Sequence, residues 1–376
     1  MPLPDPKCEN ITGKFIRKST LSDISPAGET GALEGARPCH DMSANVMAVP
    51  PPAPWQRELA QAVSDSRRLL QMLELPASMA SDADYGAADF SLRVPRGYVA
   101  RMRKGDACDP LLRQVLPVAA EAIETPGFHR DAVGDLAAMP VPGLLHKYQG
   151  RALLVTTGAC AIHCRYCFRR HFPYAEANPA QEHWAPALDY IAADTSLREV
   201  ILSGGDPLSL HDARLAALSR SLQAIPHLKY LRVHTRLPIV LPERVDDALL
   251  GWLSESRLKP IMVVHANHAH EIDAAVRSAL GRLAAAGVTL FNQSVLLAGV
   301  NDSAEALADL SLALFDAGVT PYYLHLLDRV QGTAHFEVSE TRAQELMQRL
   351  RTRLAGYLVP RLVREQQGAP FKLVLA

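Results

Sequence analysis

The sequence lacks long uninterrupted apolar runs and has no excess of positive charge. No apolar stretch reaches the roughly 18 to 20 residues that a membrane-spanning helix requires, and the N-terminus lacks the basic-then-apolar pattern of a secretory signal. The 39 Lys and Arg residues are balanced by 40 Asp and Glu residues, for a formal net charge of -1. Proteins that wrap nucleic acid or lie on anionic lipid normally need a basic excess. We therefore expect a cytoplasmic protein that binds neither nucleic acid nor membrane.

Cysteine is scarce, with six residues in a chain of 376. Three of them nevertheless lie in one short segment, at Cys160, Cys164 and Cys167. The other three are scattered without a pairing pattern. In a reducing compartment, clustered thiols bind metal more often than they form disulfides. The clustered segment is therefore the first candidate for chemistry.

The chain divides by composition into an atypical N-terminus and a globular remainder. Hydrophobic residues make up 48% of the sequence, which is enough to bury a full core and excludes disorder throughout. The N-terminal part is rich in Pro, Gly and Ser and closes with a proline run typical of an extended linker. Because Met42 and Met47 precede the first periodic segment, we expect residues 1–54 to be disordered or to reflect an over-long start annotation.

Apolar periodicity predicts an α/β protein. Helical spacing over 55–75 and a mixed segment near 111–123 predict a mainly helical region over 55–145. From residue 152 onward, short β-type runs alternate with helical stretches, which is typical of βαβ units around a parallel sheet. The predicted strands are 152–156, 199–203, 230–234, 261–265, 289–294 and 320–324. The predicted helices are 186–194, 213–225, 246–256, 273–286, 304–317 and 340–355.

These six units predict an open partial (βα)6 barrel over 146–358, followed by a C-terminal segment over 359–376, because a closed barrel of this type has eight strands. In such folds the chemistry lies at the C-terminal ends of the strands. The fifth helix has a start typical of a capping box, with Asp302 as the cap and Glu305 three residues on.

The cysteine segment follows the first predicted strand directly. Three thiolates on one loop can bind one face of a four-iron cluster, and without an evident fourth cysteine one iron is left open to a small molecule. The alternative is a zinc site with His163 or His171 as the fourth ligand. That site would make the chain a zinc-dependent module that binds RNA or protein, although the absence of a basic stripe weighs against RNA.

The cysteine spacing, with aromatic Tyr166 before the last cysteine, resembles the radical S-adenosylmethionine (SAM) superfamily and its C-x3-C-x-aromatic-C signature. The resemblance implies a [4Fe-4S] cluster on the three cysteines, with SAM on its unique iron. It also implies one-electron cleavage of SAM to a 5'-deoxyadenosyl radical and an electron donor of the flavodoxin or ferredoxin type. The segment Ser203-Gly204-Gly205-Asp206 is by itself an ordinary turn. One strand after the cysteine loop, it resembles the superfamily's motif for the methionyl amine.

Longer segments resemble lysine 2,3-aminomutases, and most closely the elongation factor P branch, from about Leu92 to the end of the chain. They include 142–147, 169–174, 265–268, 292–297 and 321–323. The resemblance implies pyridoxal 5'-phosphate (PLP) as a further cofactor and an isomerase reaction that converts L-lysine to β-lysine. For this branch it implies (R)-β-lysine, which a separate ligase attaches to elongation factor P.

The resemblance also assigns residues to the cofactors. Lys372, which alone would be taken for a solvated tail residue, matches the lysine that binds PLP covalently. The PLP phosphate positions match Lys147, Tyr148 and Arg151, with Lys147 where free-lysine mutases have arginine. Two further residues, His265 and Gln293, match positions near SAM, although a lone histidine at a strand end is more often structural. We expect the other histidines to be structural.

Substrate contacts follow from the same resemblance. Arg169 matches the arginine that pairs with the α-carboxylate, for which a guanidinium fork is well shaped. Asp328 and Glu365 match the two carboxylates that bind the far amino group, with Glu365 replacing an aspartate. A glutamate 2,3-aminomutase is the enzymatic alternative, and Asp328 disfavours it. Because the chain stops at Ala376 and has Ser303 at a cysteine position of free-lysine mutases, we expect no structural zinc. A homodimer is left open.

Overall fold

The computed structural model describes residues 52–87, 89–177 and 184–376, which belong to one compact unit. The expected disorder of residues 1–54 falls almost entirely outside these ranges. Pro54, at the edge of that segment, already begins the first helix. In the described part of the chain, no helix is both long and apolar enough to cross a membrane.

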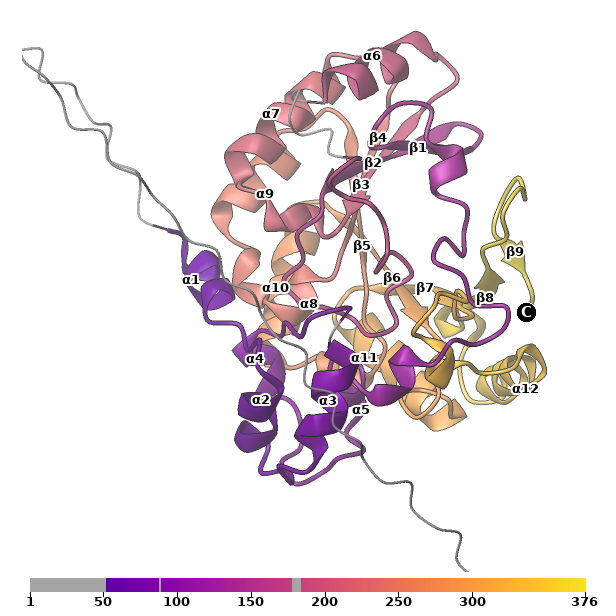
Figure 1. The fold of residues 1–376 in the computed structure, drawn as a ribbon. Coiled ribbons are helices and arrows are strands. Elements are labelled where there is room, and N and C mark those ends of the chain that lie inside the picture. Colours follow the sequence, from indigo (N-terminus) through magenta and orange to yellow (C-terminus); the bar gives the residue numbers. More distant parts are fainter. Residues whose placement is uncertain (1–51, 88, 178–183) are drawn as a thin grey trace, which may run out of the picture. The chain divides into compact units, whose positions relative to one another are not determined.

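A single nine-stranded sheet, in the order β1 to β9, organises this unit (Figure 1). The strands are β1 (Leu144–Tyr148), β2 (Arg151–Thr157), β3 (Glu199–Gly204), β4 (Tyr230–Thr235), β5 (Lys259–Val264), β6 (Thr289–Val295), β7 (Thr320–His325), β8 (Arg361–Arg364) and β9 (Leu373–Val374). Strands β2 to β8 are parallel, whereas β1 and β9 pair antiparallel at the two edges. Among the described residues β1 and β9 do not pair with each other. The predicted α/β partial barrel is confirmed.

All six predicted strands are present as β2 to β7. They were recognisable because each carries a short apolar pattern, which is nearly continuous in the buried β3 and alternates with polar residues in β4 and β6. Strand β5 ends at Val264, so His265 lies just beyond the strand end. The sequence missed β1, β8 and β9, which are short or partly polar strands at or next to the edges of the sheet and carry little periodic signal.

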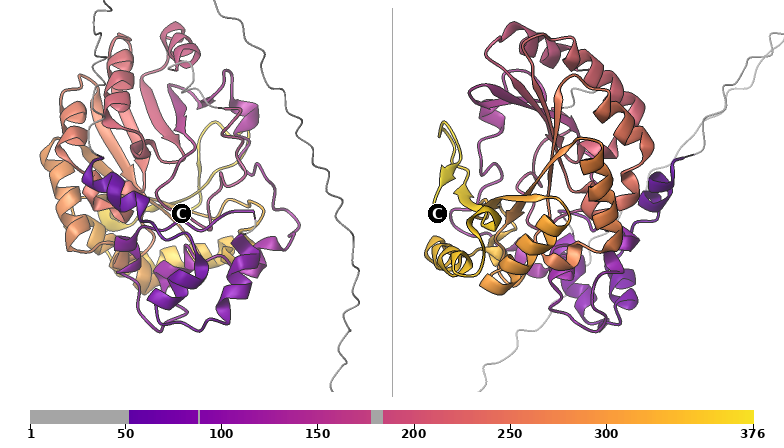
Figure 2. Two further views of the ribbon diagram at one scale, coloured as in Figure 1. Left: turned by 60° about the vertical axis from the view of Figure 1, so that its left-hand side comes forward. Right: turned by 180° about the vertical axis from the view of Figure 1, so that it is seen from behind.

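The six predicted helices of the barrel are also present, with ends shifted by a few residues. They are α6 (Ala185–Ala193), α7 (Asp212–Gln223), α9 (Asp247–Ser254), α10 (Ala274–Ala285), α11 (Ala304–Asp316) and α12 (Glu340–Arg351). The views in Figures 1 and 2 show α6, α7, α9 and α10 along the outer side of the sheet. The predicted Asp302 cap is wrong. Helix α11 starts one residue later, and the Ser303 hydroxyl accepts the 3.1 Å hydrogen bond from Ala306 N.

The region before the barrel is helical but more broken than its periodicity predicts. Segment 55–75 forms two helices, α1 (Pro54–Ala60) and α2 (Ser66–Met72), because Val63 between them pairs with Val94 in an isolated β-bridge. Further helices are α3 (Met79–Ala87), α4 (Arg96–Val99) and α5 (Pro110–Arg113). Segment 111–123 does not form one helix, since Pro117 follows α5 and only a 3-10 turn forms after it.

Candidate active site

The cysteine loop leaves the C-terminal end of β2 and carries three free, partly buried thiols. The Cys167 amide donates to the Cys164 carbonyl at 3.0 Å, which closes a tight turn. Burial raises the pKa of the Cys160 thiol, and Cys167 and Cys164 raise it further. Burial raises the pKa of Cys167 to about 11, and Cys164 adds to the effect. Cys164 and Cys167, two of the three ligands predicted for the cluster, therefore share one turn, and Cys160 precedes it on the same loop.

The two histidines of the zinc alternative are directed at backbone carbonyls. His163 Nδ1 lies 2.8 Å from Ser91 O, and the ring stacks on Phe90. His171 Nε2 lies 3.1 Å from Gln331 O. Across the described ranges, no three His, Cys, Asp or Glu side chains converge as the ligands of a single metal ion would. A four-iron cluster does not need that convergence, because each cysteine binds a different iron.

The glycine turn after β3 packs directly against the cysteine loop. Gly205 N donates to Thr157 O at 2.7 Å, and Asp206 N donates to Ala159 O at 2.8 Å. A Cβ on Gly205 would lie 2.4 Å from Ala159 O, which no real side chain tolerates. Gly204 has a φ of +117°, and a Cβ there would lie 2.6 Å from Thr157 O. Both glycines are therefore required for the close approach of the two loops.

Asp206 ties this turn to the end of β4. Its Oδ1 accepts from the Thr235 hydroxyl at 2.7 Å, and its Oδ2 accepts from Arg236 N at 2.7 Å and Leu237 N at 3.2 Å. Burial raises the pKa of Asp206 despite these hydrogen bonds. The carboxylate thus has a structural partner on each oxygen, and its role toward a cationic amine stays a prediction.

A second group of predicted residues is joined by ion pairs. Lys372 Nζ donates to Glu365 Oε2, and Glu365 Oε1 accepts from Lys147 Nζ at 3.0 Å. Lys147 Nζ also lies 2.5 Å from Asp135 Oδ1. Asp135 Oδ2 in turn accepts from Arg169 Nε at 2.7 Å. Alternating charges therefore connect Lys372 to Arg169, and we call these five residues the ion-pair chain.

Two neighbouring carboxyl groups, Glu365 of the ion-pair chain and Asp328 beside it, have pKa values shifted in opposite directions. Burial raises the pKa of Glu365, but the ammonium groups of Lys372 and Lys147 outweigh it and hold the value at about 2. Burial and the neighbouring Glu365 raise the pKa of Asp328 to about 7, despite Lys372. Two carboxyl groups with pKa values pushed apart are typical of functional sites.

Three further predicted residues adjoin the ion-pair chain. Burial raises the pKa of the Tyr148 hydroxyl, and the nearby Glu365 carboxylate raises it further. The Arg151 guanidinium lies over the Tyr148 ring, 4.7 Å from its centroid. Arg169 Nη1 donates to the Ser203 hydroxyl at 3.2 Å, at the end of β3. The ion-pair chain thus reaches from the β1–β2 edge of the sheet to the strand that leads into the glycine turn.

Among the buried side-chain atoms that have no hydrogen-bond partner within the described residues are four nitrogens from consecutive parallel strands or their ends. They are the Nε2 atoms of His234 on β4, His265 after β5, Gln293 on β6 and His325 on β7. The rings of His234 and His265 meet edge to face, with centroids 5.8 Å apart. Burial, together with the nearby charges of Arg236 and Arg169, lowers the pKa of His265 to about 4. Because buried polar atoms are normally paired, this row fits a polar ligand such as a cofactor.

Several residues beside these groups were not predicted from the sequence as site residues. His234 and His325 were expected to be structural, yet they share the row with His265 and Gln293. Asp135 lies in an irregular segment before β1, where no periodicity or motif marks it. Arg236 follows the last residue of β4. Because functional residues of such barrels lie at the C-terminal ends of strands, this position could have marked Arg236 as a candidate from the sequence.

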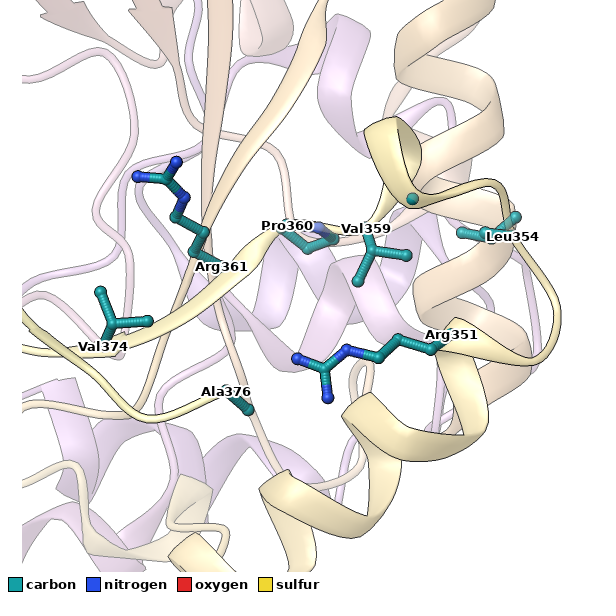
Figure 3. A pocket seen from close by; sticks show the side chains of 8 residues that line it. Arg351, Leu354, Val359, Pro360, Arg361, Val374 and Ala376 are labelled. Atoms are coloured by element: carbon teal, nitrogen blue, oxygen red, sulfur yellow. The ribbon is translucent and has the colours of Figure 1, made fainter.

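A cavity of about 510 Å³ lies elsewhere, beside β8 and the chain's C-terminal residue (Figure 3). It is lined by Arg351, Leu354, Gly356, Val359, Pro360, Arg361, Val374 and Ala376. None of the predicted site residues lines it. The candidate site is therefore defined by its contacts and its unpaired polar atoms.

No family model matches the chain. Among curated relatives, the L-lysine 2,3-aminomutase of Escherichia coli strain K12 is 52% identical over 322 residues, which cover 85% of this chain and 94% of the relative. The L-lysine 2,3-aminomutase of Haemophilus influenzae is 47% identical over 86% of this chain and 95% of the relative. That of Clostridium subterminale is 32% identical over 84% and 76%.

Among solved structures, a radical SAM methyltransferase from Sphaerobacter thermophilus matches 59% of this chain and 68% of its own, with a TM-score of 0.43 and 18% identity. That likeness is too distant to support an argument about function.

Proposed function

This chain belongs to the L-lysine 2,3-aminomutase family, and from that premise we propose that it is a radical SAM isomerase that converts L-lysine to β-lysine. The observation that carries the proposal is the ion-pair chain, which places Lys372, Glu365 and Arg169 in one connected site. Identity of 52% over most of the Escherichia coli relative supports the same activity.

The proposed cofactors fit the residues present. Three adjacent thiols suit a [4Fe-4S] cluster, and the unpaired nitrogens of His265 and Gln293 suit SAM together with the turn Ser203–Asp206. Lys372, with Lys147, Tyr148 and Arg151 nearby, suits PLP. When bound, the cluster and SAM supply a carbon radical, and PLP supplies an electron-delocalising ring. The protein positions these groups and excludes water.

Arg169 is suited to hold the substrate's α-carboxylate. Asp135 takes its Nε–H and Ser203 takes one Nη1–H, so the guanidinium is held from two sides. A guanidinium has five N–H donors, and the remaining ones can form a charge-assisted pair with a carboxylate. The fixed orientation of Arg169 would therefore place the amino acid in one pose.

Glu365 and Asp328 are suited to hold the substrate's far ammonium group. Glu365 already accepts hydrogen bonds from two primary ammonium groups, those of Lys372 and Lys147. A third ammonium group, that of a lysine substrate, could take the place of one of these two at Glu365. Glutamate as substrate would bring a carboxylate toward these two acids, and their charge disfavours it.

The finer assignment follows the segments that resemble the elongation factor P branch. We propose (R)-β-lysine as the product, attachment to elongation factor P by a separate ligase as its use, and a flavodoxin- or ferredoxin-type electron donor. We place the protein in the cytoplasm because thiols remain reduced there. A deletion strain tests the pathway, since its elongation factor P should lack the β-lysine mass increment.

Anaerobic turnover tests the reaction itself. Reconstituted protein is incubated with SAM, PLP, a strong reductant and either L-lysine or L-glutamate, and products are separated by chiral chromatography and mass spectrometry. Cys164→Ala is the inactive control, and Cys108→Ala, an exposed cysteine, is its matched partner. The proposal requires β-lysine from the wild type and from Cys108→Ala only. Cleavage of SAM without conversion of lysine would show that the substrate is wrong.

A further inference from the structure

A buried arginine contacts one of the cluster cysteines. Arg236 follows the last residue of β4, its exposed fraction is 5%, and its Nη1 lies 2.8 Å from Cys164 Sγ. We propose that Arg236 is a positioning residue that sets the reduction potential of the iron–sulfur cluster, with Glu271 as the counter-charge that limits its effect. The inference rests on the proposed function, because it requires a cluster on Cys164.

The guanidinium of Arg236 is held on its other side by groups from distant parts of the chain. Its Nη2 donates to Glu271 Oε2 at 2.8 Å, to Gln114 Oε1 at 2.7 Å and to the Tyr98 hydroxyl at 3.1 Å. Rings of Tyr98 and Tyr166 lie near the guanidinium carbon, at 5.5 and 5.6 Å from their centroids. Because these contacts hold Nη2, Nη1 of the same guanidinium points toward Cys164 Sγ.

Glu271 is fully buried and is fixed as firmly as the arginine. Its Oε1 accepts from Asn267 N at 2.8 Å, His268 N at 3.1 Å and Gln114 Nε2 at 3.2 Å. The opposite charges of Arg236 and Glu271 compensate each other inside the protein. Because Glu271 already balances the charge of Arg236, the hydrogen bond from Arg236 Nη1 to Cys164 is not needed to neutralise the arginine.

A positive charge and an N–H donor at a cluster sulfur favour the more negative form of the cluster. Reduction adds one electron from a low-potential donor and takes [4Fe-4S]2+ to [4Fe-4S]+, so the N–H contact is stronger after reduction than before it. Burial strengthens this electrostatic preference. Arginine stays protonated at every working pH, so its effect does not depend on pH.

The test is a redox titration of the full chain carrying the cluster, followed by electron paramagnetic resonance without SAM, PLP or lysine. Arg236→Gln removes the charge, and we expect the ratio of reduced to oxidised cluster at a fixed potential to fall about tenfold, which for one electron is about 59 mV. Glu271→Gln removes the counter-charge, so its midpoint should move in the opposite direction. Arg236→Lys keeps the charge but lacks the planar guanidinium, so its midpoint potential should shift less than that of Arg236→Gln.

Arg244→Gln is the matched control. Arg244 has an exposed fraction of 0% and binds Leu208 O and Asp212 Oδ1, both at 2.7 Å, rather than a cysteine. Its loss should destabilise the fold in the way that loss of any buried ion pair does. The cluster midpoint should nevertheless stay at the wild-type value.

The outcomes separate this inference from the proposed function. If wild-type protein takes up no iron and sulfide, both fail. If it loads a cluster and Arg236→Gln has the wild-type midpoint, the inference fails and the aminomutase proposal stands. If Arg236→Gln does not load a cluster, Glu271→Gln decides. A positive shift in that variant supports the inference, and an unchanged midpoint overturns it.

Discussion

The cysteine loop and the ion-pair chain are built in opposite ways. The three cysteines come from one loop, which lies so close to the glycine turn that a single Cβ at Gly205 would clash. Lys372 instead meets Glu365 through strand pairing. Strands β8 and β9 are antiparallel and Arg364 pairs with Leu373, so Glu365 and Lys372, one residue further along each strand, face each other. Asp135 and Lys147 then join from the other edge of the sheet. The structure of the cysteine loop depends on backbone shape, whereas that of the ion-pair chain depends on charge balance.

Cys164→Ala should have the largest effect, because it removes a cluster ligand from the loop. We expect loss of SAM cleavage and of aminomutase activity below detection, together with loss of the brown colour and of bound iron. Iron and sulfide analysis of anaerobic protein checks this, with Cys108→Ala as control. Full iron content in Cys164→Ala would show that Cys164 is not a ligand.

Lys372→Ala should abolish the function of the ion-pair chain and leave the cysteine loop unchanged. We expect the aminomutase rate to fall by at least about a thousandfold, because a positioned covalent anchor is worth far more than free cofactor in solution. The cysteine loop is untouched, so iron content and SAM cleavage should remain. Absorbance of bound PLP and product formation are the measurements, and Lys104→Ala, an exposed lysine, is the control. Wild-type PLP absorbance in Lys372→Ala would contradict the assignment.

Gly205→Ala should show that backbone shape governs the cysteine loop. The new Cβ would lie 2.4 Å from Ala159 O, and we expect a loss of about 2 kcal/mol in unfolding free energy and reduced iron uptake. Gly281→Ala in α10 is the matched control, because a Cβ there meets nothing within 4 Å. That control should be stabilised by about 0.5 to 1 kcal/mol. Urea unfolding of the apoprotein measures both, and equal effects would refute the argument.

Asp328 should make substrate binding beside the ion-pair chain depend on pH, without an effect on the cysteine loop. Its carboxyl group has a pKa of about 7, so acidification through pH 7 removes its charge while Glu365, with a pKa of about 2, stays ionised. We expect the KM for lysine to rise as pH falls, by up to about tenfold per unit below pH 7. Asp328→Asn should have a higher KM with a flatter pH profile. The same slope in both proteins would exclude Asp328 as the titrating group.

The features that could be predicted from the sequence are those with a short-range signal. Strands β2 to β7 were predicted because their apolar residues follow one another or alternate over short runs that are separated by helical segments. The cysteines and the glycine turn could be proposed as site residues because their spacing is local. Asp135 was missed because its only signature is the pair of cations that surround it in space.

By itself, the sequence determined the α/β partial barrel and the cysteine loop at the end of its first parallel strand, since both follow from periodicity and local spacing. Only the tertiary structure decided the charge partners: Glu365 between two lysines, Arg169 on Asp135, and Arg236 between Cys164 and Glu271. The physical reason is that electrostatic partners need proximity in space rather than in sequence. The folded sheet brings together residues from its two edges and from loops beyond several strand ends.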